Sequence, residues 1–78
     1  MLIRTQNKKE VVNALHVYIS NEVASKRKHM FATYAGKTFF HDNNISIAVY
    51  PTDDAAIEVM DEMVAFFNEN PGGIFQMR

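Results

Sequence analysis

The longest regular hydrophobic pattern in the chain runs from Thr52 to Asn70 and predicts an amphipathic helix. With each residue placed about 100° further round the helix, the apolar side chains fall within one arc of about 180°: Ala56, Ile57, Val59, Met60, Met63, Val64, Phe66 and Phe67. The opposite arc carries Glu58, Asp61, Glu62, Asn68 and Glu69. A surface helix needs an apolar stripe of only about 100° to pack on a core. We therefore expect part of this apolar arc to meet a second copy of the protein.

Five shorter segments have the alternation, or the aromatic and β-branched content, that is typical of strands. They cover residues 2–5, 11–20, 30–35, 45–50 and 74–77, and residues 39–41 are expected to extend a hairpin. Side chains two positions apart in a strand share a face. This predicts three groupings: Leu15, Val17 and Ile19 against His16 and Tyr18; Met30, Ala32 and Tyr34 against Phe31 and Thr33; and Ile45, Ile47 and Val49 against Ser46, Ala48 and Tyr50.

The ends of the helix have clear sequence signals. Pro51 ends the preceding strand, and Thr52 is a suitable N-cap residue. The run Asn70-Pro71-Gly72-Gly73 stops the helix. The predicted order is therefore β-β-β-β-α-β, an α+β fold in which a small antiparallel β-sheet carries one amphipathic helix on one face. The last strand is expected beside the first, and residues 1–78 form a single domain.

Composition narrows the class of protein. The chain has no Cys, so disulfides and thiolate metal sites are excluded and a reducing compartment is expected. No apolar run approaches the ~18 residues of a membrane span, and the first residues lack the apolar segment of a signal peptide. We expect a cytoplasmic protein that makes no membrane contact. At 78 residues its core is small, which favours a homo-oligomer.

The net charge of −1 conceals an uneven distribution along the chain. Residues 1–42 carry seven bases and three acids, whereas residues 43–78 carry one base and six acids. The first part therefore has a charge of +4 and the second a charge of −5. A protein that binds duplex DNA along an extended face is usually basic overall. Nucleic acid is accordingly the least favoured partner.

No arrangement of residues predicts catalysis, a metal or a cofactor. The three histidines, His16, His29 and His41, do not have the spacing of a metal site. Glu58, Asp61 and Glu62 share a helix face, but solvated helix surfaces have the same pattern, and the glycines do not form a phosphate-binding loop. We expect a protein that is not an enzyme.

A basic cluster followed by aromatic residues is the best candidate for a binding site. The cluster Lys26-Arg27-Lys28-His29 precedes Phe31 and Tyr34. Cations beside strand aromatics can bind phosphate and stack a base. The same cluster can instead be a solvated connection that protects an edge strand from aggregation. For a small phosphorylated ligand, the expected binding residues are Arg4, Tyr18, Lys26, Arg27, Lys28, Phe31, Tyr34 and Arg78.

The two ends of the chain and the helix together resemble a family of short, uncharacterised proteins from phages and prophages of Gram-positive bacteria. The resemblance lies in the opening Met1-Leu2-Ile3-Arg4-Thr5-Gln6-Asn7-Lys8-Lys9 with Val12-Asn13, in Tyr50-Pro51-Thr52 with Ala56 and Val59-Met60-Asp61-Glu62, and in the closing Ile74-Phe75-Gln76-Met77. Members tend to read "A..VLDEI" in the helix and "VFQMP" at the end. Here Arg78 stands in place of the usual proline, and residues 20–44 share no motif.

This resemblance implies a context for the binding site. Small phage proteins of this build are commonly host-takeover or anti-defence factors, and some are oligomers that sequester a nucleotide-derived immune signal. The first hypothesis is therefore a non-enzymatic oligomer in the host cytosol that binds an ADP-ribose-like or cyclic nucleotide. The alternative is an interaction module whose acidic helix face blocks a host protein, with Asp54, Glu58, Asp61, Glu62 and Glu69 as its contacts.

Overall fold

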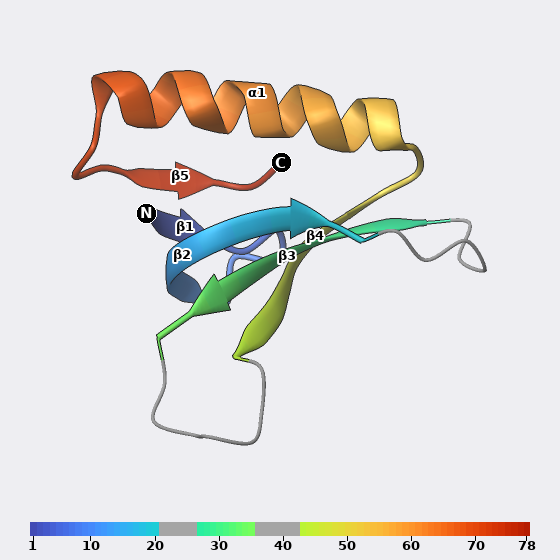
Figure 1. Cartoon of the computed structure of the whole chain (residues 1–78), viewed down its shortest axis with the longest axis horizontal. Helices are drawn as coiled ribbons and strands as arrows, with labels where there is room; N and C mark the ends of the chain where they lie inside the picture. Colours follow the sequence, from blue (N-terminus) through green and yellow to red (C-terminus); the bar gives the residue numbers. More distant parts are fainter. Residues whose placement is uncertain (21–26, 36–42) are drawn as a thin grey trace.

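The computed structural model describes residues 1–20, 27–35 and 43–78, and it has five strands and one helix in that part of the chain. In chain order these are β1 (Leu2–Arg4), β2 (Val11–Ile19), β3 (Lys28–Tyr34), β4 (Asn44–Tyr50), α1 (Asp53–Glu69) and β5 (Ile74–Gln76). The helix packs against one side of the sheet (Figure 1). The predicted α+β fold and its element order are confirmed. The predicted hairpin extension at 39–41 lies outside the described residues.

The helix begins and ends where the sequence predicts. The Thr52 side chain accepts a hydrogen bond from the Ala55 backbone N–H at 3.2 Å, as an N-cap residue does. Asp53 and Asp54 lie in the first turn, where negative charge is favoured by the helix dipole. At the other end, the Asn70 backbone N–H donates to the Phe66 carbonyl at 2.8 Å. Both ends therefore have their exposed backbone groups partly satisfied by local residues.

The strands form one sheet in the order β4-β3-β2-β1-β5. Neighbouring strands from β4 to β1 are antiparallel. The last strand pairs with the first, as predicted, but in parallel, with Leu2, Ile3 and Arg4 beside Ile74, Phe75 and Gln76. Parallel pairing requires a crossover connection, usually a helix. Here the crossover back to β1 runs through the whole of α1.

Two irregularities in strand pairing change the predicted side-chain faces. In β2 the register shifts between Ala14 and His16, and Leu15 is 67% exposed. Leu15 therefore does not share the core face with Val17 and Ile19, because the bulge inserts it as an extra residue. In β4 the register shifts so that Phe31 pairs with Ser46 while Met30 pairs with Ala48. Because of the extra residue, the consecutive side chains of Ile47 and Ala48 are both buried in the core. The prediction that they lie on opposite faces of the strand is therefore wrong.

The core lies between the sheet and the helix. Its fully buried side chains include Ile3, Met30 and Ile47, and α1 contributes Ala56, Val59 and Met63. Three aromatic rings close one end of this layer, with Phe66 and Phe67 each against Phe75. Two apolar helix residues remain outside it: Ile57 is 47% exposed and Val64 is 58% exposed. The apolar arc of the helix is thus wider than the sheet can cover.

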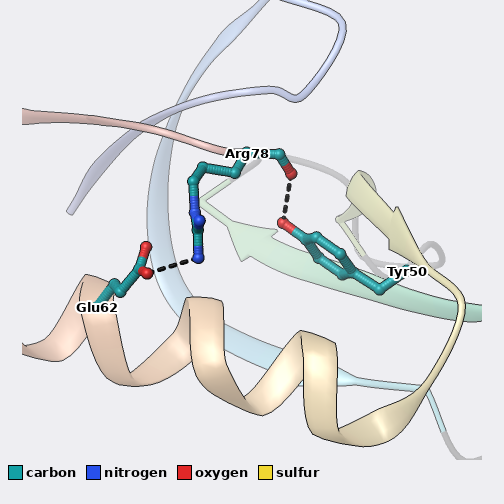
Figure 2. A network of polar contacts seen from close by, with 3 residues as sticks. All are labelled: Tyr50, Glu62 and Arg78. Carbon is teal, nitrogen blue, oxygen red and sulfur yellow. Dashed lines mark hydrogen bonds and ion pairs between the residues drawn. The ribbon is translucent and has the colours of Figure 1, made fainter.

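The end of the chain is held against β4 and α1 by polar contacts (Figure 2). The Tyr50 hydroxyl donates to the Arg78 carbonyl at 2.8 Å, and the Arg78 guanidinium pairs with Glu62 at 2.5 Å. Gln6 adds a third attachment, since its side-chain amide donates to the same Arg78 carbonyl at 2.8 Å and accepts from the Val49 backbone N–H at 3.0 Å. These contacts join the turn after β1, β4, α1 and the segment after β5.

Candidate functional site, an aromatic ladder on the open face of the sheet

Four aromatic rings stack in a row across β2 and β3. Their order is His16, Tyr18, Phe31 and His29, with successive ring centroids 5.4, 5.6 and 5.9 Å apart. The planes of successive rings differ by only 27°, 24° and 23°. We call this row the aromatic ladder. Aromatic pairs at these separations attract each other beyond the effect of their buried area, so the four rings hold a common orientation.

The strand register places the ladder on the face of the sheet away from the helix. Met30 and Ala32 are fully buried in the core. The side chains between and beside them, His29 and Phe31, must therefore point to the opposite face. Tyr18 pairs directly with Phe31 across the strands, which joins the two halves of the ladder. No described element covers this face, because α1 lies on the other side of the sheet (Figure 1).

Polar groups border the ladder on the same face. The His29 Nδ1 atom lies 3.5 Å from the Ser46 hydroxyl on β4. On the other side, Thr33 lies opposite His16 and donates its hydroxyl hydrogen to the Asn44 side chain at 2.8 Å. Imidazole nitrogens can donate or accept hydrogen bonds. The ladder thus offers apolar ring surface in its centre and hydrogen-bonding groups at both ends.

The described residues among the eight predicted binding residues do not lie together in the structure. Tyr18 and Phe31 form the centre of the ladder. Arg27 is exposed and precedes β3, two residues before His29. Lys28 belongs to β3 rather than to the connection before it, and its ammonium lies 3.9 Å from the Asp53 carboxylate at the helix start. Lys26 lies outside the described residues.

The remaining three predicted residues are away from the ladder. Arg78 pairs with Glu62 on α1 (Figure 2). Arg4 donates from its Nε atom to the Lys8 carbonyl at 3.2 Å, at the far end of β1. Tyr34 pairs with the buried Ala14 and so belongs to the helix side of the sheet. The ladder and these cations do not form one pocket.

Two ladder residues were not among the predicted binding residues. Neither His16 nor His29 has the spacing of a metal ligand, although His29 directly follows the basic cluster in the sequence. The signal that could have identified them is their position two residues from Tyr18 and Phe31, which places each histidine beside an aromatic ring on one face. In the described part of the chain, no three His, Cys, Asp or Glu side chains are grouped closely enough to hold a metal ion.

Comparison with known proteins adds no further assignment. No protein-family model matches the chain, and neither a curated protein nor a solved structure matches it. Within residues 1–20, 27–35 and 43–78, no helix has the length and apolar character needed to cross a membrane.

Proposed function

We propose that this chain is a non-enzymatic binding protein whose aromatic ladder holds the planar ring of a nucleotide-type ligand. The observation that carries the proposal is the stacked row of four rings on a face that no described element covers. Stacking of a base on an aromatic side chain contributes about 1–3 kcal/mol. Tyr18 and Phe31 would supply the apolar ring surface, while His16 and His29 would reach the polar edge of the ligand.

The charges near the ladder favour a ligand that also carries phosphate. Arg27 lies beside the strand that bears Phe31 and His29, and a guanidinium is well suited to bidentate contact with phosphate oxygens. The resemblance to phage proteins supports an ADP-ribose-like or cyclic nucleotide signal, which the protein would sequester in a defended host.

Binding can be measured as a ligand-induced rise in melting temperature, since a ligand that binds only the folded state stabilises it. The probes are ADP-ribose, a cyclic dinucleotide and AMP. The double variant Tyr18→Ala/Phe31→Ala should abolish the rise, and Arg27→Ala should reduce it for the phosphorylated probes. Tyr34→Ala is the matched control, because Tyr34 is a partly exposed strand aromatic outside the ladder. A wild-type protein whose melting temperature rises with none of the probes contradicts the proposal.

The acidic helix surface supports a second function, the capture of a basic host protein. Asp54, Glu58, Asp61 and Glu69 are exposed and no described residue pairs with them, whereas Glu62 is paired with Arg78. Complementary charge speeds association and selects partners. Reversing the charge of Glu58 and Asp61 distinguishes the two functions. It would abolish capture of a host protein and leave the nucleotide-induced rise in melting temperature unchanged.

A further inference from the structure

A stripe of apolar residues runs along the solvent side of the helix. It consists of Ile57, Met60, Val64 and Phe67, whose spacing of three, four and three residues keeps them on one line. Ile57 and Val64 are about half exposed, and Met60 and Phe67 are only partly buried against the core. We call this line the helix stripe. At 100° per residue, Asp54, Glu58 and Asp61 lie along the edge of the stripe that faces away from the core.

A second exposed apolar surface lies where β2 meets the end of β3 and the start of β4. Leu15 is 67% exposed because of the bulge in β2, Val11 is 54% exposed and Tyr34 is 38% exposed. These three side chains surround a depression of about 550 Å³, with Val12 and Ile45 in its lining. We call this the strand depression. Contiguous apolar surface of this kind usually marks an interaction site.

The border of the strand depression is basic. A neighbouring hollow of about 520 Å³ shares Glu10 and Val11 with it and is also lined by Arg4, Lys8 and Lys9. Three cations and one carboxylate therefore flank the exposed Val11. Lys8 is held there by the turn between β1 and β2, in which its backbone N–H donates to the Thr5 carbonyl at 2.8 Å. The positive charge is thus attached to a structured turn.

The two surfaces complement each other in both apolar character and charge. We propose that the helix stripe of one copy seats in the strand depression of a second copy, with Glu58 and Asp61 opposite Lys8 and Lys9 of the neighbouring molecule. Contact between two helix stripes would instead bring the acidic edges of both copies to one interface, and like charges in contact disfavour association. The strand depression of a second copy is therefore the partner that we propose for the helix stripe.

This pairing joins two different surfaces, which determines the kinds of assembly that can form. It gives a reciprocal dimer, in which the contact is made twice, a ring, or an open filament if the rotation between copies does not close. Neither surface contains a residue of the aromatic ladder, so the assembly does not depend on the ligand proposed for the ladder. In each arrangement Ile57, Val64, Val11 and Leu15 become buried, which adds apolar burial to a small core.

The test uses light scattering with size-exclusion chromatography on the full chain at high micromolar concentration. The wild type should elute as an oligomer that dissociates as salt is raised, since exposed charge pairs are screened. Val64→Glu and Leu15→Glu should each give the mass of a monomer. Ala65→Glu is the control for the helix, because Ala65 is exposed beside the stripe and gains the same charge without lying on it. The circular dichroism of all variants should match that of the wild type.

Mixing the two monomeric variants gives the decisive result. Val64→Glu retains an intact strand depression, and Leu15→Glu retains an intact helix stripe. Together they should therefore form a one-to-one complex that neither forms alone. The proposal is overturned if the wild type is a monomer, if Leu15→Glu keeps the wild-type mass, or if the mixture contains only monomers. Retention of the wild-type mass by Leu15→Glu would mean that the helix stripe pairs with something other than the strand depression.

Discussion

The substitution Gly73→Ala tests the packing of the aromatic end of the core. Gly73 lies in the turn between α1 and β5, directly beside the ring of Phe66. A Cβ atom at this position would lie 2.8 Å from Phe66 Cζ and 3.2 Å from both Phe66 Cε1 and Asn70 Cβ. The first distance is shorter than a carbon–carbon contact tolerates, so the ring must move. Phe66 packs edge-on against Phe67 at 5.2 Å and against Phe75 at 5.5 Å, and movement disturbs both contacts.

The expected cost follows from these contacts. Overpacking a core costs about 1–3 kcal/mol, and each aromatic pair contributes about 0.5–1.5 kcal/mol. We expect Gly73→Ala to lower the free energy of unfolding by about 2 kcal/mol, since part of the strain is relieved by movement of the ring. In a domain of this size, 1 kcal/mol corresponds to about 4–8 °C in melting temperature. The loss should therefore be about 8–16 °C by circular dichroism, with a parallel fall in the urea midpoint.

The chain provides a matched control one residue earlier. A Cβ atom on Gly72 would meet no atom within 4 Å, so Gly72→Ala should change the free energy of unfolding by no more than about 0.5 kcal/mol. A second control is Phe66→Leu, because removing the ring should reduce the cost of Gly73→Ala in the double variant. Equal melting temperatures for Gly72→Ala and Gly73→Ala would refute the reasoning.

Two further substitutions test the helix start and the buried phenol. Thr52→Ala removes the side chain that accepts from the Ala55 N–H, and it should cost about 1 kcal/mol in chemical denaturation; Thr52→Ser should retain most of the stability. Burial raises the pKa of the Tyr50 phenol above its ordinary value, although the nearby Arg78 guanidinium opposes this. The unfolded chain therefore loses this proton first, and the contribution of Tyr50 to stability is lost as the pH rises from about 10 through the higher folded pKa. Tyr50→Phe should lose less stability than the wild type between about pH 8 and pH 11 in urea unfolding. Equal slopes for Tyr50→Phe and the wild type would refute it.

The helix and the order of elements could be predicted because their signals are local. Thr52, Pro51 and the run from Asn70 to Gly73 act within a few residues of the positions they determine. The pairing of β5 with β1 was predicted as the simplest position for the last strand, and the structure confirms it. Its parallel direction depends on the path of the whole helix across the sheet. No residue in either strand carries that information.

The faces of β2 and β4 could not be predicted from regular alternation alone. In β2 the buried positions Val12 and Ala14 are even-numbered, whereas the half-buried positions Val17 and Ile19 are odd-numbered. A strand without irregularity cannot place both pairs on one face. The change from even to odd is visible in the sequence, but an alternation that begins at Leu15 conceals it. Such an alternation places Leu15, the extra residue, in the core.

The carboxylate partners of two cations in the predicted binding site could not be predicted from the sequence for a related reason. Lys28 and Arg78 stand near aromatic residues or strand ends in the sequence, which makes them candidates for phosphate contact. Their carboxylate partners, Asp53 and Glu62, are 25 and 16 positions away along the chain. Such pairs depend on where the helix crosses the sheet. Tertiary packing, rather than local sequence, determines which cations are already paired.

The bulge at Leu15 links the two surfaces proposed for this protein. If β2 continued the alternation of Val12 and Ala14, His16 and Tyr18 would point into the core, and Val17 and Ile19 would face solvent. The register shift reverses this arrangement: it returns Val17 and Ile19 to the core side and sends His16 and Tyr18 to the open face, where Tyr18 meets Phe31. The residue that absorbs the shift is Leu15, which is left exposed at the edge of the strand depression. Bulges commonly redirect side chains beside functional sites. One inserted residue therefore accounts for both the aromatic ladder and the apolar surface that we propose receives the helix of a second copy.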